Sequence, residues 1–149
     1  MNRAKAVFDK DFVIGEVDKR ISSSFIEHLG RCVYDGIYEP GHKTADSNGF
    51  REDVKELVRE LGVTAIRYPG GNFVSGYNWK DGVGPIEHRP RKKELAWNTI
   101  ETNQVGINEF ARWLDDIGVG MIMTANLGSG TPMEAGELVD YCNNQKGTH

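Results

Sequence analysis

The fold class is decided by residues 109–134, which read EFARWLDDIGVGMIMTANLGSGTPME. Residues 109–117 repeat apolar side chains at the spacing of a one-sided helix, and Gly118 supplies the stop that such a helix needs. The almost wholly apolar run over 119–125 predicts a strand that is covered on both faces. A loop over 126–130 follows, and the last four residues make a capping box that starts the next helix. Helix, strand and helix in this order are typical of a parallel α/β fold.

Earlier segments extend the same alternation toward the N-terminus. Residues 51–61 carry apolar side chains on one face of a helix, with Asn48 as its predicted N-cap and Gly62 as its stop. Short segments at 21–26 and 63–67 predict two more strands. The last helix is expected to bury a stripe made of Ala135, Leu138, Val139 and Cys142. The order of these units predicts parallel strands joined by right-handed crossovers.

Two regions fall outside this alternation. Residues 4–8 and 12–17 flank the turn-like residues 9–11, and together they predict a β-hairpin. A stretch rich in glycine, proline and aromatic residues runs from 72 to 108. A loop of that length inside a compact domain is usually functional, and its aromatic residues argue against disorder.

Composition bounds the class of protein. The chain has 149 residues, 38% of them hydrophobic, and 18 glycines, as expected for one globular domain. A net charge of −4 excludes a general attraction to nucleic acid or to an anionic membrane. The first residues lack the apolar core of a signal peptide, and Cys32 and Cys142 fit reduced thiols. We therefore expect a cytoplasmic protein without a structural zinc site.

Three further patterns are assigned to ordinary roles. The loop at 128–130 precedes a helix, but it has neither the Lys-Ser/Thr pair of a phosphate-binding loop nor the Rossmann spacing. The basic run at 88–93 belongs to an acidic chain and is interpreted as a solvated loop. His28 and His88 are too isolated to be proposed as metal ligands. The sequence therefore indicates no cofactor.

Polar or glycine-rich residues end each of the three predicted strands. They are residues 27–28, 67–72 and 126–130. Because parallel α/β folds bind ligands at the carboxyl ends of their strands, we expect a binding site at this edge.

Five segments make the sequence recognisable. They are residues 24–36 (SFIEHLGRCVYDG), 66–73 (IRYPGGNF), 79–85 (WKDGVGP), 103–110 (NQVGINEF) and 126–131 (NLGSGT). In this order, and across nearly the whole chain, they resemble the α-L-arabinofuranosidases of glycoside hydrolase family 51. The resemblance implies a retaining exo-enzyme that removes terminal arabinofuranosyl residues from arabinan or arabinoxylan oligosaccharides. Members of this family are commonly intracellular and hexameric, which implies a homo-oligomer.

The resemblance also implies an architecture, a (β/α)₈ barrel with a β-sandwich built from both chain ends. Residues 1–18 would contribute a hairpin to the sandwich, and residues 19–149 would form the first three βα units of the barrel. A retaining glycosidase needs two carboxyl groups, and in this family they end the fourth and seventh barrel strands. We therefore expect no catalytic residue in this chain, and no activity without the remaining part of the barrel, from the same protein or a companion chain. The alternative is a non-catalytic carbohydrate-binding or assembly subunit that requires a complementary chain.

Five residues are candidates for binding substrate. The resemblance makes Glu27 a ligand of furanose hydroxyls and Asn72 a contact to arabinose. The alternatives are a solvated acid and a turn asparagine. Gly71 would let the backbone approach the sugar, Trp97 would stack on the acceptor side, and Asn126 would support the pocket floor.

Neighbouring residues have less specific expected roles. Gly70, like Gly71, would let the backbone approach the sugar closely. Arg67 would either orient neighbouring carboxylates through two hydrogen bonds or have a structural role, and the sequence favours neither alternative. Phe73, Tyr77 and Trp79 are left mostly to packing.

Overall fold

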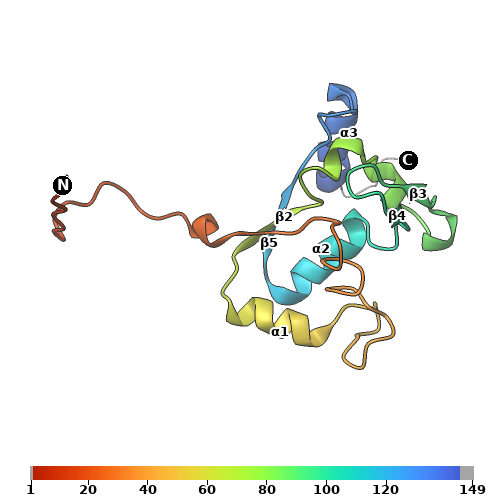
Figure 1. Cartoon of the computed structure of the whole chain (residues 1–149), viewed down its shortest axis with the longest axis horizontal. Helices are drawn as coiled ribbons and strands as arrows, with labels where there is room; N and C mark the ends of the chain where they lie inside the picture. The colour runs from red at the N-terminus through yellow and green to blue at the C-terminus, as the bar shows by residue number, and fades with distance from the viewer. Residues whose placement is uncertain (1, 145–149) are drawn as a thin grey trace.

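The computed structural model describes residues 2–144, which form an α/β fold with an extended N-terminal arm (Figure 1). The main elements are β1 (Ser24–Phe25), α1 (Glu52–Glu60), β2 (Ala65–Tyr68), α2 (Ile107–Ile117), β5 (Gly120–Met123) and α3 (Pro132–Asn143). The stretch between β2 and α2 holds the 3-10 helices η2 (Val74–Gly76), η3 (Trp79–Gly82) and η4 (Ile86–His88), and the strands β3 (Lys92–Lys93) and β4 (Ile100–Glu101). Another 3-10 helix, η1 (Lys19–Ser22), precedes β1. Strands β1, β2 and β5 form one parallel sheet in the order β1-β2-β5, which confirms the predicted parallel strands.

The hydrophobic core lies between α2 and one face of the sheet. Ile66 and Tyr68 of β2 are buried there, and the Tyr68 ring stacks on Phe110 of α2 with centroids 3.9 Å apart. Trp113 and Leu114 of the same helix are buried in this cluster. The apolar stripe predicted for this helix is therefore the centre of the core.

The other face of the sheet is bare. Phe25, Arg67 and Ile122 are aligned across the three strands by their pairing register. All three side chains are exposed, Ile122 at 38%. Strand β5 is also an edge of the sheet. The prediction that residues 119–125 are covered on both faces is therefore wrong, because within residues 2–144 only one face of the sheet has helices packed on it.

Helix α3 begins as predicted but is less buried than predicted. The Glu134 backbone N–H donates to Thr131 Oγ1 (3.2 Å), and the Thr131 N–H donates to Glu134 Oε2 (2.6 Å), which completes the capping box. The helix packs on η3, where the Trp79 indole donates to the Glu134 carbonyl (3.3 Å). Leu138 is buried, whereas Val139 and Cys142 of the predicted stripe stay exposed. No helix within residues 2–144 has the length and apolar character needed to cross a membrane.

The predicted N-terminal hairpin is not formed. Its turn is present, with the Phe12 N–H donating to the Asp9 carbonyl (3.0 Å), but residues 2–18 contain no strand. The arm extends away from the body of the molecule, and Phe8 is 92% exposed (Figure 1). An isolated two-stranded hairpin is marginal in water, and nothing within residues 2–144 packs against the apolar side chains of this arm.

The start of α1 also differs from the prediction. The N-cap position is Arg51, not Asn48. The Asp46 carboxylate accepts the N–H groups of Asn48 and Phe50, so these residues form a turn of their own before the helix. The buried Lys55 ammonium donates to the same carboxylate (2.6 Å), which ties this turn to the helix.

One buried ion pair orders the long stretch between β2 and α2. The Arg89 side chain is 3% exposed and makes two hydrogen bonds with the Glu109 carboxylate, at 2.9 and 3.0 Å. Its guanidinium also donates to the carbonyl oxygens of Gly84 and Asn103. Burial opposes ionisation of Glu109, but the hydrogen bonds from Arg89 and the Gly106 N–H hold its pKa below the usual value. The ion pair between Arg89 and Glu109 therefore holds this stretch against the start of α2.

Candidate functional site

The carboxyl ends of the parallel strands meet at one edge of the sheet. Backbone hydrogen bonds continue past the strands, from the His28 N–H to the Pro69 carbonyl (3.2 Å) and from the Thr124 N–H to the Tyr68 carbonyl (2.9 Å). The structure therefore brings Glu27, at the end of β1, beside the turn at 69–73 that follows β2.

Glu27 is held in a defined position at this edge. The residue is 8% exposed, and its Oε1 atom accepts the N–H groups of Phe73 (2.8 Å) and Gly71 (3.1 Å). Its Oε2 atom accepts no hydrogen bond from residues 2–144. One oxygen is therefore anchored to the turn, and the other is available to accept a hydrogen bond from a ligand.

Gly70 provides the space that the Glu27 side chain occupies. A Cβ atom on Gly70 would lie 2.5 Å from Glu27 Cγ and 3.0 Å from Oε1, and the backbone φ angle of 151° also favours glycine. At Gly71 a Cβ atom would make only ordinary contact, 3.7 Å from Arg67 Nη2. The close approach expected at these two glycines is therefore between Gly70 and Glu27.

Asn72 and Arg67 lie beside Glu27 with their side chains exposed. Within residues 2–144 the Asn72 side chain makes no hydrogen bond, although its carbonyl accepts the Ser75 N–H (3.3 Å). The Arg67 guanidinium lies 4.3 Å from the centre of the Phe25 ring on the bare face of the sheet. The Asn72 amide is therefore free to meet a ligand at this edge, whereas the Arg67 guanidinium contacts the Phe25 ring.

Trp97 lies in the hairpin loop that joins β3 and β4. The Glu94 carboxylate accepts the N–H groups of Ala96 and Trp97, which gives the loop a rigid internal turn. The Trp97 indole N–H is buried and has no hydrogen-bond partner within residues 2–144. The residue as a whole is half-buried.

Asn126 uses its whole side chain to shape the loop after β5. Its Nδ2 group donates to the Tyr77 carbonyl (3.0 Å) and to Ser129 Oγ (3.1 Å). Its Oδ1 atom accepts the backbone N–H groups of Gly128, Ser129 and Gly130. Such an arrangement fits the expected support of a pocket floor better than a direct polar contact to substrate.

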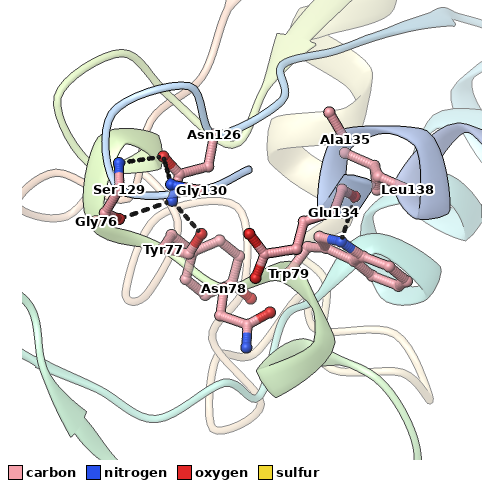
Figure 2. Close-up of a pocket in the computed structure, with 10 residues that line it drawn as sticks. All are labelled: Gly76, Tyr77, Asn78, Trp79, Asn126, Ser129, Gly130, Glu134, Ala135 and Leu138. Carbon is pink, nitrogen blue, oxygen red and sulfur yellow. Dashed lines mark hydrogen bonds between the residues drawn. The ribbon is translucent and has the colours of Figure 1, made fainter. Parts of the chain in front are cut away.

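This loop borders a cavity of about 210 Å³ (Figure 2). The lining residues come from the stretch after β2, the loop after β5 and the start of α3. They are Gly76, Tyr77, Asn78, Trp79, Asn126, Ser129, Gly130, Glu134, Ala135 and Leu138. A second cavity of about 90 Å³ lies between Phe73 and the β3–β4 hairpin. Of the five candidate residues, only Asn126 lines the larger cavity, and Glu27, Gly71, Asn72 and Trp97 lie outside both.

The sequence analysis missed a buried polar network beneath Glu27. His28 Nε2 lies 2.8 Å from Tyr68 Oη, and His28 Nδ1 lies 3.0 Å from Glu101 Oε2. The Tyr34 hydroxyl donates to the other oxygen of Glu101. The sequence does contain a signal for this network, because His28 directly follows Glu27. Neighbouring side chains at a strand end point to opposite sides, so His28 is expected to point away from the ligand side that Glu27 faces.

The network shifts the acid–base behaviour of its members. Burial opposes ionisation of Glu101, but its contacts with His28 and Tyr34 hold its pKa below the usual value. Burial and the adjacent Glu101 carboxylate raise the pKa of the Tyr34 hydroxyl. Burial also raises the pKa of Tyr68 well above its usual value. At neutral pH the site therefore holds one buried carboxylate surrounded by protonated hydroxyls.

Comparison with known proteins identifies relatives of this chain. A family model described as the α-L-arabinofuranosidase 1 domain matches residues 57–147. The intracellular exo-α-(1→5)-L-arabinofuranosidase 1 of Bacillus subtilis is 57% identical over 149 residues. That match covers 100% of this chain and 30% of the relative, so the chain spans about a third of that relative's length.

Solved structures give the same result. A family 51 α-L-arabinofuranosidase from Bifidobacterium longum superposes with a TM-score of 0.86 at 55% identity, covering 89% of this chain and 26% of that one. The thermostable family 51 α-L-arabinofuranosidase of Thermotoga petrophila superposes with a TM-score of 0.87 at 44% identity, covering 92% of this chain and 28% of that one.

Proposed function

This chain belongs to the α-L-arabinofuranosidases of glycoside hydrolase family 51, and on that premise we propose that it is the N-terminal part of a retaining, exo-acting member. The complete enzyme would hydrolyse terminal arabinofuranosyl residues of arabinan or arabinoxylan oligosaccharides. Residues 19–149 would form the first three βα units of a (β/α)₈ barrel. The bare sheet face and the free edge of β5 support this proposal, because further barrel strands would cover both.

The observation that carries the proposal is the geometry of Glu27. Its carboxylate is anchored through Oε1 by two backbone N–H groups, which leaves Oε2 for a ligand. A furanose ring offers hydroxyl donors, and a carboxylate in a fixed position binds them without paying to order its own side chain. Glu27 would therefore orient the sugar, not attack it.

The other candidates would complete the edge of the subsite. Asn72 offers a free amide beside Glu27, and Gly71 leaves its backbone open to the sugar. Trp97 would provide an aromatic face on the acceptor side, and Asn126 would hold the loop that forms the floor.

The chemistry itself would come from residues that this chain does not contain. Hydrolysis with retention uses one carboxyl group as acid/base and a second as nucleophile, and the family pattern assigns both to later barrel strands. The chain alone would thus be inactive, and its partner would be the remaining part of the barrel. We also propose that residues 1–18 join a β-sandwich and that the enzyme is a homo-oligomer. The intracellular name of the Bacillus subtilis relative supports a cytoplasmic location.

A chimera tests this proposal. The 149-residue chain would replace the matching part of the Bacillus subtilis relative. We expect the chimera to release arabinose from α-1,5-linked arabino-oligosaccharides and the 149-residue chain to release none. Turnover by the 149-residue chain alone would contradict the proposal, and so would a folded chimera without turnover. A folded chimera that binds the sugar but does not hydrolyse it would favour the alternative, a non-catalytic binding subunit.

Glu27 is tested within the same chimera. Glu27→Gln keeps the size of the side chain but weakens its acceptors, so kcat/KM is expected to fall about 10- to 100-fold, the equivalent of one charge-assisted hydrogen bond. Glu60→Gln is the matched control, because Glu60 lies exposed at the end of α1. Equal kcat/KM values for the two variants would remove Glu27 from the subsite.

A further inference from the structure

His28 and Glu101 form a buried pair that joins distant parts of the chain. Their side chains are 3% and 7% exposed, and His28 Nδ1 lies 3.0 Å from Glu101 Oε2. Within residues 2–144 no other basic side chain lies within 4.0 Å of the Glu101 carboxylate. The Tyr34 hydroxyl and the Asn103 N–H both donate to Oε1 of Glu101, so the loss of the His28 contact would leave its Oε2 atom buried without a donor.

On one side the pair is connected to Glu27. The His28 ring stacks on Phe73 with centroids 4.6 Å apart and planes inclined by 16°. The backbone N–H of Phe73 is one of the two donors that hold the Glu27 carboxylate. His28 Nε2 also faces the Tyr68 hydroxyl at 2.8 Å, which fixes the ring from the β2 side.

On the other side the pair is connected to Trp97. Glu101 lies in β4, where its backbone is paired with Lys92 of β3, and the loop between these strands carries Trp97. The Glu94 carboxylate accepts two backbone N–H groups inside that loop, so we expect a displacement of Glu101 to move the hairpin and its loop together. Glu101 thus lies at the base of the β3–β4 hairpin, whose loop carries Trp97.

We propose that His28 is a positioning residue, whose Nδ1 contact with Glu101 sets the place of the β3–β4 hairpin, and of Trp97, relative to Glu27. Carboxylate oxygens only accept, so the contact is attractive when Nδ1 carries a hydrogen, and Nδ1 has no other polar partner within residues 2–144. The inference deepens the proposed function, because it names the contact that keeps Trp97, on the acceptor side, in position relative to Glu27, on the sugar side. Only the activity test of the inference rests on the proposed function.

Two substitutions separate this role from simple packing. In Asn the terminal amide group occupies the place of Nδ1, so His28→Asn retains a donor to Glu101 and loses the Tyr68 contact. In Gln it occupies the place of Nε2, so His28→Gln retains the Tyr68 contact and loses the donor to Glu101. Both variants lose the stacking on Phe73, and only His28→Asn also loses the Tyr68 contact. A change that His28→Gln shows and His28→Asn does not show therefore reports the loss of the Glu101 contact.

The first experiment uses the 149-residue chain labelled with 5-fluorotryptophan, whose three tryptophans give three ¹⁹F resonances. We expect His28→Gln to shift or broaden the Trp97 resonance and to leave those of Trp79 and Trp113 in place. His28→Asn should leave all three in place. Identical spectra for the two variants, or equal movement of all three resonances, would overturn the proposal.

A double variant keeps this test decisive if the buried charge unfolds the single one. His28→Gln combined with Glu101→Gln removes both the imidazole and the buried carboxylate, so no unpaired buried charge destabilises the fold. The Trp97 resonance is still expected to move in the double variant. An unmoved resonance there would also overturn the proposal.

The second experiment measures activity in the chimera. We expect His28→Gln to lower kcat/KM for arabino-oligosaccharides about tenfold, since a displacement of about 1 Å can cost as much as 100-fold. The inhibition constant for free L-arabinose, which occupies the sugar side only, should stay within twofold. His28→Asn should restore the oligosaccharide kcat/KM. Equal losses in both variants would contradict the inference, whereas an inactive chimera with the expected ¹⁹F result would count against the proposed function alone.

Discussion

Gly70→Ala is the sharpest test of how this chain prepares Glu27. The new Cβ atom would lie 2.5 Å from Glu27 Cγ, whereas ordinary contact begins at 3.4 Å. The glutamate must therefore retreat by about 0.9 Å, the difference between these two distances. Its hydrogen bonds from the N–H groups of Gly71 and Phe73, now 3.1 and 2.8 Å, would lengthen beyond the range in which a hydrogen bond holds.

The expected cost follows from those two bonds. Hydrogen bonds to a charged group each contribute about 1.5–3 kcal/mol, and water at the strand edge would replace part of what is lost. A net loss of about 1.5–3 kcal/mol corresponds to a fall of about 10- to 100-fold in kcat/KM. The φ angle of 151° adds backbone strain, so the melting temperature of the chain should also fall by several degrees.

The assay is the initial rate of the chimera on an aryl α-L-arabinofuranoside and on arabinotriose. Gly41→Ala is the matched control, because a Cβ atom there meets nothing within 4 Å and the backbone φ angle is ordinary. A Gly70→Ala chimera that keeps kcat/KM within twofold of the Gly41→Ala chimera would refute the argument. Such a result would mean that the position of the Glu27 side chain has no effect on the reaction.

Three further outcomes are expected. Arg89→Met should lower the free energy of unfolding of the 149-residue chain by about 3–5 kcal/mol in urea titrations, because it leaves the buried Glu109 carboxylate without its positive partner. Arg91→Met is the control, because Arg91 is exposed and its loss should leave the free energy of unfolding unchanged. Since the folded pKa of Glu109 lies below the ordinary 4.5, its contribution to stability should be complete above that pH and should be lost as the pH falls through the lower folded pKa. Thermal melts between pH 7 and pH 3 measure this loss, and an Arg89→Met chain with the same pH dependence as the parent would contradict it. Trp97→Ala should raise the KM of the chimera for arabino-oligosaccharides by about fivefold and leave inhibition by L-arabinose unchanged, since losing about 40 Å² of buried apolar area costs about 1 kcal/mol. An unaltered KM would remove Trp97 from the acceptor side.

Local patterns were sufficient to predict most helices and strands. The apolar spacing of residues 109–117, the αL glycine at Gly118 and the capping box at 131–134 all appear in the structure as predicted. Each depends on contacts between residues three or four apart, which any chain with these side chains makes whenever it is helical.

Local patterns failed where the outcome depends on distant neighbours. The turn at 9–12 forms, but its arms stay unpaired because no surface within residues 2–144 covers them. Strand β5 has the apolar sequence of a strand covered on both faces, yet one of its faces is bare. A pattern records which side chains favour burial, and the tertiary structure decides whether anything buries them.

The candidate site divides in the same way. The residue types at the strand ends were enough to nominate Glu27, because parallel strands carry their ligands at their carboxyl ends. Only the tertiary structure shows that Gly70 makes room for this side chain and that His28 meets Glu101 beneath it. The sequence by itself thus determined the helices, the strand direction and the family of this protein, through short-range periodicity and recognisable segments. The tertiary structure decided which polar groups are buried together, because such contacts join residues far apart in the chain and depend on how the whole sheet and its loops pack.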